Sequence, residues 1–390
     1  MWFPKLLPIV LLALFSGPIF SASPEDSVIA LARAVSQLPA DSSVVELPEG
    51  LYTIGSTWVI SKPHVVIRGA GPGKTILMRA PNFEGVLVRM DAEGSTLSKL
   101  TLDGNGTRTV LSLNRRGIIA DTLEVKNSTH IGIAVPASDC RITGSLITGF
   151  GPATAPSMGI WHDAGKGPTD STITIDHSTI KNNGMCGIYC TGGTVTITNN
   201  QITGNHIITN VGGGQIDIGN AFTTNTVAII RGNTISDGGS IKAGGIEAGG
   251  GKFTVTDNTI RNHGSGGIGL GHNIIGATVT GNTISNCGRN LNDHNKPQNR
   301  SGIYVGYGAS NIEIAGNRCF DDQPTKTQTY GIILVSPPRR SDPRFAPKAM
   351  EHVVIKDNDL RSNIHPEGLL DESGAQDRII VRNLPSQENR

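Results

Sequence analysis

A short strand-like motif, Gly-Ile-variable-apolar, recurs along the sequence and constrains the fold more than any other feature. Its clearest copies begin at Gly159, Gly187, Gln215 (where glutamine replaces the glycine), Gly245, Gly267 and Gly302. Successive copies lie 22 to 35 residues apart, and a second strand-like run and an Asn-x-Ile motif recur in the same cycle. Such a cycle fits one coil of a parallel β-helix, whereas leucine-rich repeats would need helical segments and propeller blades would need four strands.

Within each copy, alternation along a strand separates two sets of side chains. Successive residues point to opposite faces, so the isoleucine and the fourth residue are expected to point inward and the third residue outward. The outward residues, which we call the outward column, are Trp161, Tyr189, Asp217, Glu247, Gly269 and Tyr304. Because this set combines aromatic residues with two carboxylates, we expect it to form the functional face.

The Asn-x-Ile motifs place an asparagine at the same phase of each cycle. These asparagines are Asn200, Asn233, Asn258, Asn282, Asn317 and Asn358. Asparagine tolerates left-handed backbone angles, and stacked amides can hydrogen-bond along a ladder. We therefore predict a structural role for them.

Bulk composition narrows the class of protein. Glycine accounts for 50 of the 390 residues, and the hydrophobic content of 37% is too high for a disordered chain. The formal net charge is +1. Because nucleic-acid-binding domains carry a basic footprint, a nucleic acid partner is not expected.

The N-terminus reads as a secretion signal. Lys5 precedes an apolar run over Leu6–Phe20, and small residues suited to cleavage follow. We predict a signal peptide over residues 1–23, a single β-helix domain over 24–384 and a loose tail over 385–390. The expected product is a secreted or periplasmic monomer with no stable membrane insertion after cleavage.

The five cysteines do not resemble a disulfide framework. They are Cys140, Cys186, Cys190, Cys287 and Cys319. Cys186 and Cys190 lie about 13 Å apart on an extended strand, too far for a disulfide bond. We expect small buried hydrophobic residues, with one bridge at most.

Three segments near the N-terminus resemble the opening coils of a known superfamily. The segments are LPEGLYTI from Leu47, VVIRGAGPGKTIL from Val65 and SKLTLDGNGT from Ser98. They resemble right-handed parallel β-helix proteins of the pectate-lyase-like superfamily, which includes pectate lyases, polygalacturonases, alginate epimerases and phage tailspikes. The resemblance implies an all-β solenoid whose open end is covered by an N-terminal helical cap near residues 25–40.

Asp217 and Glu247 occupy the same position on consecutive coils and would lie about 4.8 Å apart. Like charges this close raise one pKa or require a cation. The pair could be the acid and the base or nucleophile of a glycosidase, a Ca²⁺ site, or a base for epimerisation or β-elimination. The plain alternative is two solvated carboxylates.

Loop insertions fall mainly just before the Gly-Ile strands, and they would stack into a wall beside the outward column. Lys242 and Arg300 lie on this wall side, and His263 lies on an intervening coil. The loop over 288–300 adds His294, and His272 follows a strand on the other side. Basic residues beside acids resemble the arrangement in β-helix polysaccharide lyases, which implies binding of a uronate polymer. The alternative is that these basic residues are ordinary solvated loop residues with no role in binding.

The scarce aromatic residues concentrate in the column. Trp161, Tyr189 and Tyr304 would present ring faces suited to sugar rings. Cross-coil stacking that stiffens the sheet is the alternative.

Together these features predict an exported enzyme acting on a polysaccharide in a groove, by β-elimination or hydrolysis of a uronic-acid-containing chain. Asp217, Glu247, Lys242, His263 and Arg300 are the catalytic candidates. Substrate-binding candidates are Trp161, Tyr189, Tyr304, His272 and His294. Possible Ca²⁺ at Asp217 and Glu247 is the one cofactor considered.

Two alternatives remain open from the sequence. One is a non-catalytic carbohydrate-binding or adhesin-like surface β-helix. The other is a polysaccharide C5-epimerase, because GIWHD at Gly159–Asp163 resembles the DPHD motif of alginate C5-epimerases. Its register and leading acid differ, and His162 falls at an inward position.

Overall fold

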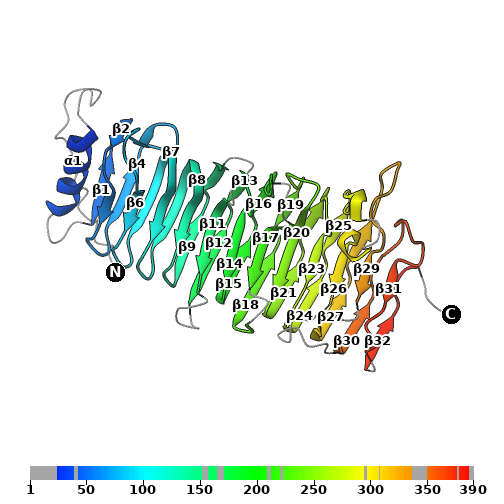
Figure 1. Ribbon diagram of the computed structural model, residues 1–390. Helices are drawn as coiled ribbons and strands as arrows, with labels where there is room; N and C mark the ends of the chain where they lie inside the picture. Colours follow the sequence, from blue (N-terminus) through cyan, green and yellow to red (C-terminus); the bar gives the residue numbers. More distant parts are fainter. Residues whose placement is uncertain are drawn as a thin grey trace, which may run out of the picture.

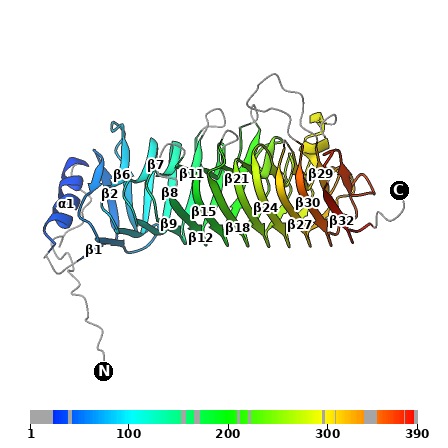
Figure 2. The same ribbon diagram turned by 90° about the horizontal axis from the view of Figure 1, so that it is seen from below.

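The computed structural model describes residues 24–38, 43–151, 157–164, 171–208, 212–219, 223–293, 297–306, 308–335, 349–375 and 377–385. They form one elongated solenoid of parallel strands, seen from the side in Figure 1 and from below in Figure 2. The predicted all-β parallel β-helix is confirmed. The predicted signal peptide and most of the tail lie outside the described residues. No helix within the described ranges is both long and apolar enough to cross a membrane.

A single α-helix covers the N-terminal end of the solenoid. Helix α1 (Pro24–Ser36) packs against β2 (Gly50–Ile54) and β3 (Trp58–Ile60). Figure 1 shows it at the N-terminal end of the solenoid. Leu31 and Val35 are buried against the first coil, whereas Ile29 is 55% exposed. A stacked sheet otherwise exposes its apolar core at its ends, so the helix serves as a cap.

Strands stack on three faces. The column sheet carries the outward column and contains β3 (Trp58–Ile60), β6 (Val86–Met90), β11 (Met158–Asp163), β14 (Ile188–Thr191), β17 (Gly213–Gly219), β20 (Ala243–Gly249), β23 (Ile268–Leu270), β26 (Ile303–Val305), β29 (Ile332–Leu334) and β31 (Leu369–Asp371). Two long strands, β7 (Thr96–Leu113) and β8 (Ile119–Val135), run through all three faces and join them.

The other two faces complete each coil. The β1 sheet contains β1 (Val44–Leu47), β4 (Val66–Gly69), β9 (Cys140–Thr143), β12 (Thr172–Asp176), β15 (Gly193–Thr198), β18 (Thr226–Arg231), β21 (Gly251–Thr256), β24 (Ile274–Thr280), β27 (Ser310–Ala315), β30 (Glu351–Lys356) and β32 (Arg378–Val381). The β2 sheet contains β2 (Gly50–Ile54), β5 (Thr75–Arg79), β10 (Leu146–Phe150), β13 (Thr179–Asn183), β16 (Gln201–Thr203), β19 (Thr234–Ser236), β22 (Thr259–Arg261), β25 (Thr283–Ser285) and β28 (Arg318–Phe320). Two short 3₁₀ helices, η1 (Leu291–Asp293) and η2 (Pro297–Arg300), lie in the loop over 288–300 that precedes β26.

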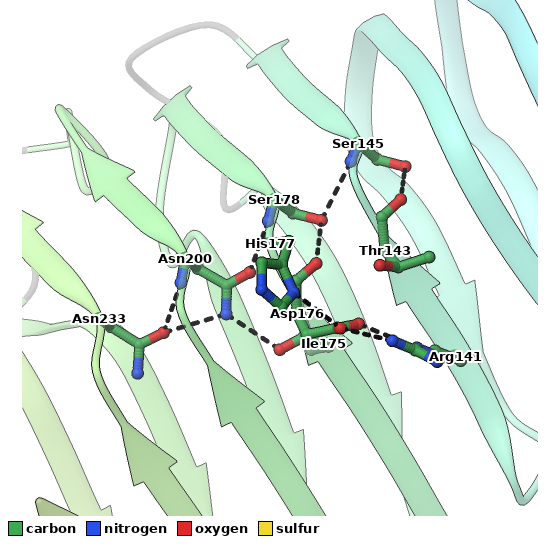
Figure 3. Close-up of polar contacts among 9 residues, drawn as sticks. All are labelled: Arg141, Thr143, Ser145, Ile175, Asp176, His177, Ser178, Asn200 and Asn233. Atoms are coloured by element: carbon green, nitrogen blue, oxygen red, sulfur yellow. Dashed lines mark hydrogen bonds and ion pairs between the residues drawn. The ribbon is translucent and has the colours of Figure 1, made fainter.

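The predicted asparagines form a continuous buried ladder. Each amide nitrogen donates to the side-chain oxygen of the asparagine on the next coil, as Asn200 Nδ2 does to Asn233 Oδ1 at 3.0 Å (Figure 3). Toward the N-terminus the ladder continues through the hydroxyls of Ser178 and Ser145 (Figure 3). The predicted structural role is confirmed.

The left-handed backbone angle lies one residue earlier than the sequence predicts. The residue before each ladder asparagine has positive φ, for example 55° at Asn199 and 57° at Asp257, so the ladder asparagine itself makes only the hydrogen bonds. The five cysteines are all buried and free, so the one possible disulfide is not formed.

Candidate functional site

The register of the column sheet aligns the outward column as the alternation predicted. Tyr189 pairs with Trp161 and with Asp217, Asp217 pairs with Glu247, and Glu247 pairs with Gly269. Tyr304 pairs with Gly269 on the next coil. All six residues are partly exposed, whereas the flanking isoleucines, such as Ile216 and Ile246, are buried. The column therefore stands on a rigid apolar core.

Asp217 and Glu247 form the floor of an open pocket of about 510 Å³. Loops preceding the column strands supply one side of the pocket, including Lys242, Ser265 and Asn299, and residues following the strands supply the other side, including His272. The structure therefore has an open pocket between two rims at this point of the column.

The two carboxylates, here called the acid pair, lean toward opposite ends of the column. Asp217 Oδ2 accepts a weak hydrogen bond from Cys186 Sγ, on the preceding coil, at 3.9 Å. Glu247 turns toward the following coil, where a Cβ on Gly269 would lie 3.3 Å from Glu247 Oε2. Glycine at 269 thus leaves room for the glutamate. The backbone spacing of about 4.8 Å therefore does not set the separation of the carboxylates.

Both acids hold their protons more tightly than ordinary carboxyl groups. Burial raises the pKa of Asp217 to about 6, and the Cys186 thiol partly opposes this rise. Burial and then the charge of Asp217 raise the pKa of Glu247 to about 7. Between about pH 6 and pH 7, Asp217 is therefore mostly ionised and Glu247 mostly protonated, a pattern typical of acid–base sites.

Two of the basic candidates line the pocket and two do not. Lys242 and His272 are lining residues. The prediction of His263 as a basic residue of this site is wrong. Its side chain is completely buried, and its Nε2 lies 3.3 Å from the Ile235 carbonyl oxygen. Burial lowers the pKa of His263 to about 4. It lies inside the coil because the chain turns there between strands.

Arg300 also differs from the prediction. It is 7% exposed, and its guanidinium donates to the carbonyl oxygens of Gly288 and Thr327 at 3.0 and 2.9 Å. Its position before a column strand suggested a groove residue, but the side chain instead ties two wall loops together. His294 lies outside the described residues.

The aromatic candidates extend the site along the column. Trp161 and Tyr189 precede Asp217 by two strands and one strand, and Tyr304 follows Glu247 by two strands. Burial and then the nearby Asp217 raise the pKa of the Tyr189 hydroxyl, which keeps it protonated. His162 is an inward, buried residue as expected, with Nδ1 2.7 Å from the Val135 carbonyl oxygen.

Sequence reasoning missed a cluster behind the pocket wall. His206 is fully buried, its Nδ1 lies 3.3 Å from Ser240 Oγ, and its Nε2 has no hydrogen-bond partner among the described residues. A Cβ on Gly213 would lie 3.2 Å from this Nε2 and 3.7 Å from Asp217 Oδ2. The glycine leaves only backbone between the imidazole and the pocket. Loop residues such as His206 follow no strand period, so no pattern in the sequence pointed to this cluster.

Metal ligation has limited support from side chains. In the ranges that the structure describes, no group of three or more His, Cys, Asp or Glu residues is arranged to hold a metal ion. The acid pair supplies two carboxylates, and any calcium held there would need further oxygen atoms from backbone, water or substrate.

Comparison with known proteins supports the fold. A family model described as a right handed beta helix region matches residues 168–339. The comparison with curated protein sequences found no match.

Several solved structures are similar over most of this chain. The A-module of mannuronan C-5 epimerase AlgE6 from Azotobacter vinelandii is 14% identical, with a TM-score of 0.59, over 92% of this chain and 96% of its own. A mannuronic acid specific polysaccharide family 6 lyase from human gut microbiota is 16% identical, with a TM-score of 0.56, over 94% and 82%. The alginate lyase AlyF-OU02 is 16% identical, with a TM-score of 0.58, over 93% and 82%. The chain therefore has the right-handed parallel β-helix fold.

Proposed function

We propose that this protein is a polysaccharide-active enzyme that cleaves glycosidic bonds, with the acid pair as its chemical centre. The observation that carries the proposal is the raised pKa of both Asp217 and Glu247 at the floor of one open pocket. The activities of the similar solved proteins, two lyases and an epimerase, support a polysaccharide as the class of substrate.

Hydrolysis is the reaction that the acid pair fits best. Glu247 has the higher pKa, so it would hold the proton and donate it to the glycosidic oxygen as the C–O bond breaks. Asp217 has the lower pKa, so it would be ionised and would act on the sugar carbon directly or through a water molecule. Water supplies the hydroxyl group and the proton that complete the two products.

β-Elimination is the second candidate, and Lys242 favours it. This lysine lines the same pocket as the acid pair, where its charge would neutralise the carboxylate of a uronic acid residue. A base would remove the proton next to that carboxylate, the C–O bond to the leaving sugar would break, and a carbon–carbon double bond would form. Calcium bound by the acid pair would supply the same neutralisation as Lys242.

The two reactions leave different products, so one assay separates them. The protein is incubated with pectic, alginate and neutral polysaccharides, each with calcium or with a chelator. New reducing ends without ultraviolet absorbance indicate hydrolysis, whereas absorbance from a new double bond indicates elimination. Inverted sugar configuration without cleavage would indicate an epimerase, and binding without any turnover would indicate a carbohydrate-binding protein. Either of these last two results would contradict the proposal.

The acid pair is tested by isosteric variants in the same assay. We expect Asp217→Asn and Glu247→Gln each to lower turnover at least about 100-fold, because each removes a group that moves a proton. Glu313→Gln is the matched control, since Glu313 lies on the β1 sheet in an ion pair with Lys356. Wild-type turnover in both acid-pair variants would also contradict the proposal.

A further inference from the structure

A second pocket lies toward the N-terminal end, where the β2 sheet turns into the column sheet. Its volume is about 810 Å³, and it is lined by the end of β5, the loop between β5 and β6, and residues of β6 and β7, including Arg79, Glu84, Val86 and Arg108. All of its lining residues fall within the described part of the chain. None of them belongs to the pocket that contains the acid pair.

Strand register places this second pocket on the same path as the acid pair. Val86 pairs with Thr109 at the pocket, and three residues further along the same strands Arg89 pairs with Ser112. Ser112 pairs with Ala134, and Ala134 pairs with Trp161 of the outward column. From Arg89 to Asp217 there are five strand spacings, which amount to about 24 Å.

The second pocket is cationic, unlike the acid pair. Arg79 is held in place by hydrogen bonds from Nε and Nη2 to the Asn105 carbonyl oxygen, at 3.1 and 2.7 Å, and from Nη1 to the Phe83 carbonyl oxygen. Neutral carbonyl groups leave the charge of its guanidinium uncompensated. Arg108 is exposed and has no ion pair with any described residue, and Glu84 is the only acid that lines the pocket.

The surface between the two pockets suits an extended chain of sugars. Next to the cationic pocket the column continues as Ser112 and Ala134, whose small side chains project little above the sheet. Trp161 and Tyr189 follow and present aromatic rings before Asp217. A sugar chain lying along the column would therefore cross small residues and then two aromatic platforms.

We propose that the second pocket binds an anionic sugar residue, bearing a carboxylate or a sulfate group, of the same polymer that reaches the acid pair. Arg108 supplies the mobile contact, since its guanidinium group can match either anion in a bidentate geometry. Arg79, whose Nε, Nη1 and Nη2 already donate to carbonyl oxygens, adds a fixed positive charge. Glu84 weakens the attraction and so limits the affinity. The inference rests on the proposed function only in that the polymer is shared; the binding itself needs no turnover.

The test measures binding by calorimetry in a Glu247→Gln background, so that no substrate is consumed. The probes are carboxylated oligogalacturonate, sulfated oligocarrageenan and neutral cello-oligosaccharide chains, each long enough to span about 24 Å. Arg108→Gln is expected to weaken binding of an anionic chain about two- to fivefold, and Glu84→Gln to tighten it, with both effects shrinking at high salt. Arg33→Gln, on the exposed side of α1, is the matched control.

Opposite signs for the two variants cannot arise from partial unfolding, which would weaken binding in both. A stronger response for the carboxylated or for the sulfated chain identifies the anion, and either supports the proposal. No binding of any anionic chain, equal changes in both variants, or equal changes with the neutral chain would overturn it. If binding depends on Arg108 while the wild-type protein turns over no polymer, the proposed function fails and the anionic site stands.

Discussion

Asp217 and Glu247 occupy equivalent positions in consecutive coils, and their neighbours make them chemically different. Asp217 accepts a hydrogen bond from the Cys186 thiol, which favours its ionised form, whereas Glu247 lies over Gly269 and next to the charge of Asp217. Asp217 therefore loses its proton first as the pH rises. In the proposed hydrolysis, this order makes Glu247 the proton donor.

The acid pair should make the stability of the protein depend on pH. Both folded-state pKa values lie above the ordinary values, so the folded protein binds more protons than the unfolded chain between about pH 4 and pH 7. The free energy of unfolding should therefore fall as the pH rises through this window. Glu247→Gln should reduce the fall by on the order of 2 kcal/mol, as measured by urea denaturation at a series of pH values. A fall of the same size in Glu247→Gln as in the wild type would show that Glu247 titrates normally.

Residue positions on strands could be predicted from the sequence, and positions in turns could not. Alternation along the strand correctly predicts that Trp161 and Asp217 face outward and that His162 faces inward. His263 and Arg300 lie in segments without a period, and their burial depends on contacts with other coils, which the sequence does not reveal. The same limitation hid His206 behind Gly213.

At the scale of elements, the asparagine ladder joins the coils through buried hydrogen bonds. Asn258 Oδ1 accepts from both nitrogens of Asn233, and Asn258 Nδ2 donates to the Ile230 carbonyl oxygen and to Asn282 Oδ1. Each rung therefore satisfies polar groups on the coils before and after it. A buried polar group that loses its partner costs about 1–3 kcal/mol.

Replacing one rung should destabilise the solenoid strongly. Asn258→Ala leaves an N–H group of Asn233 and the carbonyl group of Ile230 without partners, so we expect a loss of at least about 3 kcal/mol in the free energy of unfolding. Asn82→Ala, at an exposed position, is the control and should change the free energy of unfolding by less than about 0.5 kcal/mol. Similar shifts of the denaturation midpoint in the two variants would argue against a structural role for the ladder.

The spacing of the asparagines was sufficient to predict the ladder, but not its turn geometry. Several residue types occupy the left-handed position before each rung, including Asn199, Gly232 and Asp257. These residues share tolerance of positive φ rather than identity. A search for one repeated residue therefore finds the rung and misses the turn.

At the scale of the whole molecule, the solenoid turns a local repeat into a long, straight surface. Stacking places residues 22 to 35 apart in sequence about 4.8 Å apart in space. The Gly-Ile motif predicted this surface from Trp161 to Tyr304. Its continuation to Arg89 was not predicted, because the first coils lack the motif and their alignment follows only from the paired strands.

The resulting surface has a direction. A cationic pocket lies near the capped end, aromatic residues follow, and the acid pair lies beyond them. The position of the chemistry within a bound polymer would follow from this order, with the anionic part of the chain held toward α1. Only the assembled coils reveal such an order, since the residues concerned are scattered over most of the sequence.

The central claim is that Glu247 holds a proton and donates it during catalysis while Asp217 is ionised. The most direct test is the pH dependence of kcat/KM on whichever polysaccharide the protein cleaves. The expected profile is bell-shaped, with one limb near pH 6 from Asp217 and the other near pH 7 from Glu247. Glu247→Gln should abolish the alkaline limb together with most of the activity. A profile that stays flat between about pH 5 and pH 8, or an unchanged profile in Glu247→Gln, would contradict the claim.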